Sequence, residues 1–271
     1  MTPIQQMFLG LGKAPERTYL DNIFSTYLWK GNDTSGRSIN NGINLSGSGE
    51  EGLVWIKSRG VGRNHLLVDT VRGSSKNLKS NFWSGEGNET NAVTGFASNG
   101  FTLGSDDLTN NNDEDYASFT FKKTPKFFDI VTFTGSGTAR TIPHLLGCVP
   151  GCIMVKRRDD DAKWAVYHRG VHPTSSHNYA LELETTSSAL SNDSADYWNG
   201  TAPTSTHFSV GTHATTNADT ATYVAYIFAG GASTATTARS IMFDGTGDSL
   251  TTNTSSDYDL GTGDFTIECW I

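Results

Sequence analysis

Short runs of β-branched and aromatic residues, several of them alternating with polar positions, recur along most of the chain. Representative runs are Phe119–Phe121, Asp129–Thr134, Tyr179–Glu184 and Thr222–Phe228. Alternation with period two is typical of strands that have one face in a core and the other in solvent. Turn-forming residues separate the runs, at Asn32-Asp33, Asn41-Gly42, Asn99-Gly100 and Asn199-Gly200. The pattern predicts an all-β protein of tandem β-sandwich or jelly-roll-like domains.

The same motifs occur twice in the same order, at offsets of about 99 to 107 residues. The matching pairs are Leu53–Lys57 with Cys152–Lys156, Gly100–Ser105 with His207–Thr212, Tyr116 with Tyr223, and Arg37–Ile39 with Arg140–Ile142. Several matches in one order indicate a tandem duplication. We expect two β-sandwich repeats, at residues 26–128 and 129–229.

The segments outside the repeats differ from them in composition. Residues 230–239 are small and polar, which is typical of a linker. Residues 240–271 have the pattern of the opening strands of a further β domain, but about 30 residues cannot close a sandwich. We therefore expect the natural chain to continue beyond Ile271, or this piece to pair with another element of an assembly. Residues 1–25 hold apolar clusters without a counterpart in the repeats, and these need to be buried as a packed first strand or against a partner.

Charge and cysteine content narrow the classes of function. The chain has 28 acidic and 20 basic residues and a formal net charge of −8, with no dense basic segment, which argues against a nucleic-acid partner. Its longest apolar runs are about five residues, whereas a membrane-spanning helix needs about 20, so no membrane insertion is predicted. Cys148, Cys152 and Cys269 cannot make a disulfide framework and are predicted to be small buried thiols of a protein folded in a reducing cytosol.

Motifs for catalysis and metal binding are present only in fragments. Gly247–Leu250 has the nucleophile block of a hydrolase family, but the Asp-x-x-His of that family is absent from the sequence. The spacing of His168 and His172 would suit a metal only on a helix, which Gly170 breaks. The acidic clusters lack the spacing of a calcium loop. The sequence therefore predicts no catalytic residue, no metal site, no cofactor and no enzyme.

Two aromatic pairs lie in loop-like stretches at near-equivalent places of the two repeats. They are Phe82-Trp83 and Tyr197-Trp198. Exposed pairs would stack on sugar rings, and buried pairs would fill the sandwich core. Burial is the preferred interpretation, and glycan stacking is the alternative.

Several motifs resemble a duplicated module of tail-fibre-type virion proteins from marine, cyanophage-like tailed bacteriophages. The motifs are Trp29–Asn32, Gly52–Lys57, Asp69–Gly73, Asn99–Gly104 and Trp164–Gly170. In addition, residues 243–270 resemble the beginning of a laminin-G/concanavalin-A-like domain, of a kind that often binds carbohydrate in such proteins.

The resemblance implies a structural virion component, most simply a tail fibre that forms a homotrimer and is made in the host cytoplasm. Its N-terminal arm would attach to a tail adaptor, nozzle or baseplate protein, and its C-terminal region would contact a host glycan. The arm residues expected to make the attachment are Ile4, Met7, Phe8, Leu9, Leu11, Tyr19 and Leu20. A tailspike-type depolymerase and a capsid decoration or tail adaptor protein remain the alternatives.

Overall fold

The structure is a computed structural model, and it describes residues 19–191 and 195–231. In these residues nearly all regular structure is β, in seventeen strands accompanied by two 3-10 turns and two short helices. The strands pair in antiparallel sheets throughout. The prediction of an all-β protein with a sandwich architecture is confirmed.

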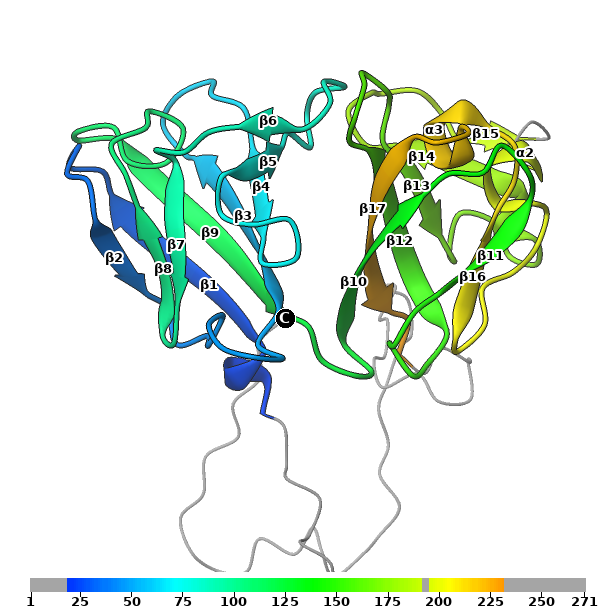
Figure 1. Ribbon diagram of the computed structural model, residues 1–271, viewed down its shortest axis with the longest axis horizontal. Helices are drawn as coiled ribbons and strands as arrows, with labels where there is room; N and C mark the ends of the chain where they lie inside the picture. Colours follow the sequence, from blue (N-terminus) through cyan, green and yellow to red (C-terminus); the bar gives the residue numbers. More distant parts are fainter. Residues whose placement is uncertain (1–18, 192–194, 232–271) are drawn as a thin grey trace, which may run out of the picture. The chain divides into compact units, whose positions relative to one another are not determined.

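The first repeat contains nine strands in two antiparallel sheets. They are β1 (Phe24–Lys30), β2 (Arg37–Asn40), β3 (Gly52–Ser58), β4 (Leu66–Asp69), β5 (Lys76–Leu78), β6 (Gly87–Asn88), β7 (Val93–Ala97), β8 (Gly100–Leu103) and β9 (Asp115–Lys122). The larger sheet has the order β1-β9-β3-β4-β5-β6, and the smaller has the order β2-β8-β7. The smaller sheet lies over one face of the larger one, and the 3-10 turn η1 (Leu20–Asn22) precedes β1 (Figure 1).

The second repeat contains eight strands. They are β10 (Phe128–Thr134), β11 (Arg140–Pro143), β12 (Pro150–Arg157), β13 (Ala165–His168), β14 (Tyr179–Glu182), β15 (Leu190–Ser191), β16 (His207–Val210) and β17 (Thr222–Ala229). The larger sheet has the order β10-β17-β12-β13-β14-β15, and β11 pairs with β16. The connections hold the 3-10 turn η2 (Ser176–Asn178) and the helices α2 (Ala195–Trp198) and α3 (Ala214–Asn217).

The two larger sheets have the same topology. Each strand of β1-β9-β3-β4-β5-β6 has its counterpart at the same place in β10-β17-β12-β13-β14-β15. The repeat that was read from the sequence therefore recurs as a repeated arrangement of strands. The residue boundaries proposed for the two domains stay a prediction. β1 begins at Phe24, so the last two residues of the segment 1–25 belong to the first sheet, where Phe24 is opposite Phe121.

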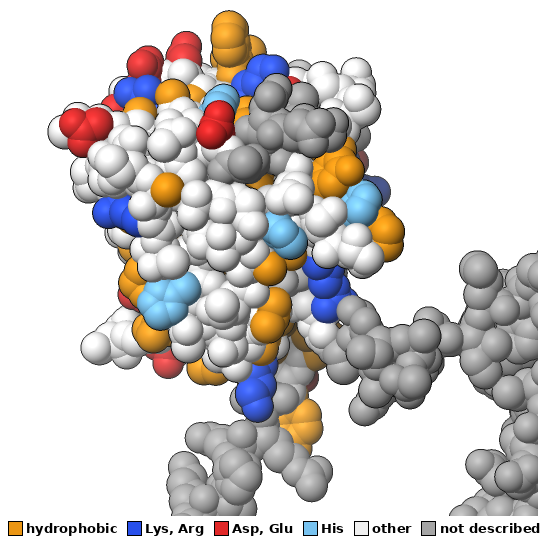
Figure 2. Space-filling model, turned by 90° about the vertical axis from the view of Figure 1, so that its right-hand side faces the viewer, with side chains coloured by type: hydrophobic (Ala, Val, Ile, Leu, Met, Phe, Trp, Pro, Cys, Tyr) orange, Lys and Arg blue, Asp and Glu red, His pale blue; other side chains and the backbone are white. Residues whose placement is uncertain are grey.

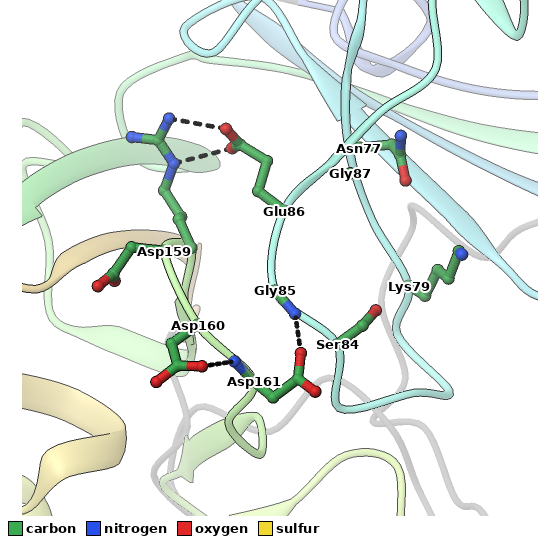
Figure 3. A pocket seen from close by; sticks show the side chains of 10 residues that line it. Asn77, Lys79, Ser84, Gly85, Glu86, Gly87, Asp159, Asp160 and Asp161 are labelled. Carbon is green, nitrogen blue, oxygen red and sulfur yellow. Dashed lines mark hydrogen bonds and ion pairs between the residues drawn. The ribbon is translucent and has the colours of Figure 1, made fainter.

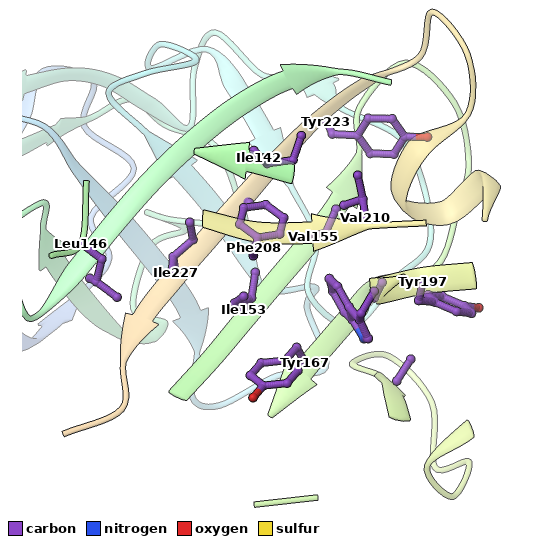
Figure 4. Close-up of a cluster of buried hydrophobic side chains, with 14 of the residues drawn as sticks. Ile142, Leu146, Ile153, Val155, Tyr167, Tyr197, Phe208, Val210, Tyr223 and Ile227 are labelled. Atoms are coloured by element: carbon purple, nitrogen blue, oxygen red, sulfur yellow. The ribbon is translucent and has the colours of Figure 1, made fainter. Parts of the chain in front are cut away.

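Each repeat has its own hydrophobic core between its larger and its smaller sheet. In the first repeat, Phe101 of β8 packs in one cluster with Val54 of β3. In the second repeat, Phe208 of β16 packs with Ile153 of β12 in the same way (Figure 4). The offsets between these partners are those of the sequence repeat. The duplicated apolar positions thus fill two separate inner cores.

A third hydrophobic cluster joins the two repeats. Its members from the first repeat are Leu53, Leu67 and Leu78, and those from the second are Phe128, Ile130, Met154, Trp164, Val166, Val224 and Tyr226. All of them come from the larger sheets or the residues beside them. Central strands of both larger sheets are consequently buried on two faces, which explains their nearly continuous apolar sequences.

A buried tyrosine fixes the same loop in both repeats. The Tyr116 hydroxyl accepts a hydrogen bond from the Asn111 backbone N–H at 3.0 Å and donates one to the Asp107 carbonyl at 2.7 Å. Tyr223 makes the equivalent pair of hydrogen bonds at 2.8 and 2.6 Å. Both side chains are fully buried, and burial raises the pKa of Tyr116 to about 12. The duplication therefore includes polar contacts as well as apolar packing.

Left-handed backbone occurs at the predicted turns. Positive φ angles are found at Asp33 (54°), Gly42 (89°), Gly100 (135°) and Asn199 (53°). At Gly100, in the β7–β8 hairpin, a Cβ atom would lie 1.9 Å from the Ile39 carbonyl oxygen. Only glycine fits both this angle and this approach.

Candidate functional site

Most of the predicted anchor lies outside the described residues, as do the C-terminal segment 240–271, Gly247–Leu250 and Cys269. The anchor residues concerned are Ile4, Met7, Phe8, Leu9 and Leu11. Tyr19 and Leu20 are described, and they are 59% and 64% exposed at the start of the first repeat. Their role in attachment stays a prediction.

The two aromatic pairs have opposite environments. Tyr197 and Trp198 are buried in the second core, and the Trp198 indole donates to the Tyr179 carbonyl at 3.1 Å. Phe82 and Trp83 are 46% and 53% exposed. Burial, the preferred interpretation, therefore describes Tyr197 and Trp198 but not Phe82 and Trp83. Glycan stacking stays a prediction, and only the rings of Phe82 and Trp83 offer an exposed surface for it.

The two pairs also occupy different places in the repeat, contrary to the sequence-based expectation. Phe82-Trp83 lies in the loop between β5 and β6, whereas Tyr197-Trp198 lies in α2, between β15 and β16. The helix α2 places the rings of Tyr197 and Trp198 in the core. The loop between β5 and β6 is held through its backbone, and the rings of Phe82 and Trp83 are left in solvent. The two dipeptides are 115 positions apart, which is outside the offsets of the repeat, so their similarity does not reflect equivalent positions.

A polar pocket of about 440 Å³ lies at the junction of the two repeats, beside the exposed pair. The first repeat contributes the loop Lys79–Gly87 with Asn77 of β5, and the second contributes Arg158–Asp161 after β12 (Figure 3). We call this the junction pocket. Sequence reasoning missed it because its two sides are far apart along the chain and carry no recognised motif.

Backbone contacts hold the two sides of the junction pocket together. The Gly85 N–H donates to the Asp161 carboxylate at 3.0 Å, and the Glu86 N–H donates to the Arg158 carbonyl at 2.8 Å. A Cβ atom at Gly85 would lie 3.0 Å from the carbonyl oxygens of Arg158 and Asp160. A glycine at this position is what permits the close approach of the two loops.

Lys156 anchors the loop that carries the exposed pair. Its side chain is fully buried, and its ammonium group donates to the carbonyl oxygens of Trp83, at 2.7 Å, and Ala162. Burial lowers the pKa of Lys156 to about 8. The equivalent Lys57 of the first repeat is only half-buried and donates within its own hairpin, to the carbonyl of Val61 at 3.2 Å. The second lysine has thus become a contact between repeats.

A buried ion-pair network lies behind the junction pocket. The Arg72 guanidinium contacts the Asp69 carboxylate at 2.5 Å and Glu86 at 3.0 Å, and donates to the Tyr226 hydroxyl at 2.8 Å. Arg158 also donates to Glu86, at 2.8 and 3.1 Å. The side chains of Arg72 and Asp69 are completely buried. The network connects the first repeat to the second through charged hydrogen bonds, buried at Arg72 and Tyr226 and partly exposed between Glu86 and Arg158.

Two acidic groups of the junction pocket, Glu86 and Asp159, lack the raised pKa of a general acid. Burial alone would raise the pKa of Glu86, but hydrogen bonds from Arg158 and Arg72 outweigh it and hold that pKa below the ordinary value. The hydrogen bond from Arg157 likewise lowers the pKa of Asp159. A general acid for glycoside cleavage needs a raised pKa. The pocket is therefore arranged for polar binding, with fixed donors and acceptors.

A protein-family profile matches residues 21–236, and its description is a domain of unknown function, DUF7483. The chain belongs to the DUF7483 family. The match spans both repeats and the junction pocket, so the DUF7483 unit is the pair of sandwiches rather than one of them. The described residues of both repeats also belong to one compact unit. No curated protein and no solved structure matches this DUF7483 chain.

The other candidates from the sequence do not assemble into sites in the DUF7483 structure. Within residues 19–191 and 195–231, no three His, Cys, Asp or Glu residues gather to hold a metal. His172 stacks on Tyr179 at 4.9 Å, and the histidines visible on one face lie apart from one another (Figure 2). Cys148 and Cys152 are free and only half-buried, so the prediction of buried thiols is wrong in degree, although burial raises the pKa of Cys152 to about 11.

No helix in the described part of the chain is both long and apolar enough to cross a bilayer.

Proposed function

We propose that this DUF7483 protein is a non-enzymatic structural component of a virion, a tail-fibre-type appendage of a tailed bacteriophage. The sequence resemblance in motifs such as Trp29–Asn32 and Gly52–Lys57 supports the proposal. The structural observation that carries it is the union of the two sandwiches through a shared apolar cluster and a buried ion-pair network.

An appendage has to hold its shape between the particle and the host surface. Domains of one chain move relative to each other by default, unless the interface between them is large and hydrophobic. Here Leu53, Leu67 and Leu78 of the first repeat are fully buried against the second, and Tyr226 adds hydrogen bonds from the other side. Such a junction suits a stiff segment of a fibre better than a flexible tether.

The proposal assigns the other parts of the chain to the two ends of the appendage. Residues 1–25 attach to a tail adaptor, nozzle or baseplate protein, and the region that begins at residues 240–271 contacts a host glycan. Three copies form the appendage, which is located in the virion after synthesis in the host cytoplasm. Exposed Tyr19 and Leu20 at the start of the first repeat are available for contacts of the arm.

Immunogold electron microscopy of the particles made by the encoding genome tests the proposal. Antibodies against residues 19–231 should label the tail appendages. Label on the head would favour a capsid decoration protein, and particles without label would contradict a virion role. A reducing-end assay with purified protein and host polysaccharide distinguishes the depolymerase alternative, because a structural fibre should release no sugar.

A further inference from the structure

An exposed aromatic pair and a polar pocket share one loop of the first repeat. Phe82 and Trp83 lie between Lys79 and Ser84, and both of these line the junction pocket. The two rings are 6.4 Å apart, nearly perpendicular to each other, and about half exposed. Exposed apolar rings beside polar groups are typical of a surface that binds a ligand.

Hydrogen bonds fix the backbone that carries the exposed indole of Trp83. The Trp83 carbonyl accepts hydrogen bonds from the Lys156 ammonium at 2.7 Å and from the Ala162 N–H at 3.0 Å. Gly85 and Glu86, which follow it, are bonded to the second repeat. A ligand that binds there does not have to order the loop, so less of its binding free energy is lost.

The fold itself does not require these rings. The equivalent loop of the second repeat, residues 183–189 between β14 and β15, contains no aromatic residue. The second repeat nevertheless forms the same six-stranded sheet. Phe82 and Trp83 are therefore a feature of the first repeat alone.

The junction pocket also contains a buried amide donor without a partner. Asn77 is 2% exposed and lines the pocket, and its Nδ2 atom makes no hydrogen bond to any described residue. A buried donor of this kind costs free energy until an acceptor reaches it. Because the Nδ2 atom is itself closed off from solvent, a ligand oxygen in the pocket becomes its acceptor only when the Asn77 side chain turns toward the pocket.

The charges of the junction pocket indicate which ligand fits. Glu86 and Arg158 neutralise each other, and Lys79 is then the single cation of the lining against Asp159, Asp160 and Asp161. The balance is acidic, and carboxylates remain as acceptors for hydroxyl groups. An anionic ligand would be repelled by these carboxylates. A sugar ring combines an apolar C–H face, which packs on an aromatic ring, with hydroxyl groups that both donate and accept hydrogen bonds. We propose that Phe82, Trp83 and the junction pocket together bind a neutral saccharide unit of a glycan.

This site is separate from the C-terminal region that is proposed to contact a host glycan, and it holds whether or not the protein belongs to a virion. The test uses the full chain and isothermal titration with neutral oligosaccharides of glucose, galactose, mannose and N-acetylglucosamine, and with sialylated and sulfated glycans for comparison. We expect at least one neutral oligosaccharide to bind with one site per chain, and the anionic glycans to bind more weakly.

Variants locate the binding. Trp83→Ala should weaken it by about tenfold or more, because the ring is the main contact surface, and Ser84→Ala should weaken it less. Phe119→Ala is the matched control, since Phe119 is 42% exposed on β9, outside the junction pocket, and it should leave binding unchanged. Both aromatic residues are exposed, so the variants should keep the near-ultraviolet circular dichroism of a folded protein. Three results would each overturn the proposal. They are no binding of any neutral sugar, binding by Trp83→Ala as tight as by the wild type, and tighter binding of anionic than of neutral glycans.

Discussion

The hydroxyl group of Tyr226, in the second repeat, donates a hydrogen bond of 2.8 Å to the carboxylate of Asp69, in the first repeat, and both side chains are fully buried. The corresponding residue of the first repeat is Phe119, which has no hydroxyl group and is 42% exposed. The two copies of the sandwich therefore differ specifically on the face where they meet. Burial raises the pKa of Tyr226 well above 10, so it stays a neutral donor.

Tyr226→Phe should destabilise the protein by about 1–3 kcal/mol, because a buried carboxylate and a buried guanidinium each lose a hydrogen-bond partner. Urea denaturation measures the change. Tyr27→Phe is the matched control, since Tyr27 is half-buried and its hydroxyl makes no hydrogen bond to the described residues, so its cost should be under about 0.5 kcal/mol. Equal costs for the two variants would contradict a role of the Tyr226 hydroxyl.

Arg72→Met should cost about 3–5 kcal/mol, since it leaves the carboxylate of Asp69 buried without its cation, whereas Glu86 keeps its ion pair with Arg158. Lys30→Met, which breaks an ion pair whose side chains are more than half exposed, should cost under about 1 kcal/mol. Denaturation at pH 7 compares the two. A cost for Arg72→Met as small as that of Lys30→Met would mean that the network does not stabilise the junction.

The duplicated fold could be read from the sequence because its signals are local. Pairs such as Leu53–Lys57 and Cys152–Lys156, and the turn at Asn99-Gly100, are visible as short motifs with a constant order. The union of the repeats was not predicted, because it depends on which outer-face residues meet across the junction. Nothing in the sequence around Asp69 indicates that its partner is Tyr226, 157 positions away.

The two equivalent tyrosines of the inner cores should make equal and independent contributions. Tyr116→Phe and Tyr223→Phe each remove a hydroxyl that accepts from one backbone N–H and donates to one carbonyl, at a cost of about 1–3 kcal/mol. The double variant should lose the sum of the two within about 0.5 kcal/mol, because the residues lie in separate cores. If the free energies of unfolding lost by the two single variants differed by more than about 2 kcal/mol, the tyrosine would not stabilise the two repeats equally.

Lys156 gives a prediction for pH. The folded protein loses the Lys156 proton near pH 8, whereas the unfolded chain keeps it up to about 10.5, so the unfolded state binds more protons between these values. The stability due to Lys156 therefore rises with pH across this window. The difference in free energy of unfolding between wild type and Lys156→Met should increase by about 1–2 kcal/mol from pH 7.5 to pH 9.5. Subtracting the free energy of unfolding of the variant from that of the wild type cancels the contribution of the other titrating groups. A difference that is constant or falls with pH would contradict a buried, readily deprotonated lysine.

The candidate site shows the limit of sequence reasoning more clearly than the fold does. Phe82-Trp83 and Tyr197-Trp198 look alike as dipeptides, yet one is exposed and the other buried. The difference arises from Lys156, which holds the Trp83 carbonyl from the other repeat and so fixes the loop from its backbone side. Such a contact between distant segments leaves no periodic or compositional pattern.

Native-state hydrogen exchange tests most directly whether the two repeats form one body. The slowest amides of β3 and β9 and those of β12 and β17 should exchange with the same free energy of opening, because the cluster around Leu53 and Tyr226 unfolds only when both sheets separate. Tyr226→Phe should lower both values by the same amount. Different opening free energies in the two sheets, with Tyr226→Phe affecting the second repeat alone, would show that the repeats fold independently and would contradict the account.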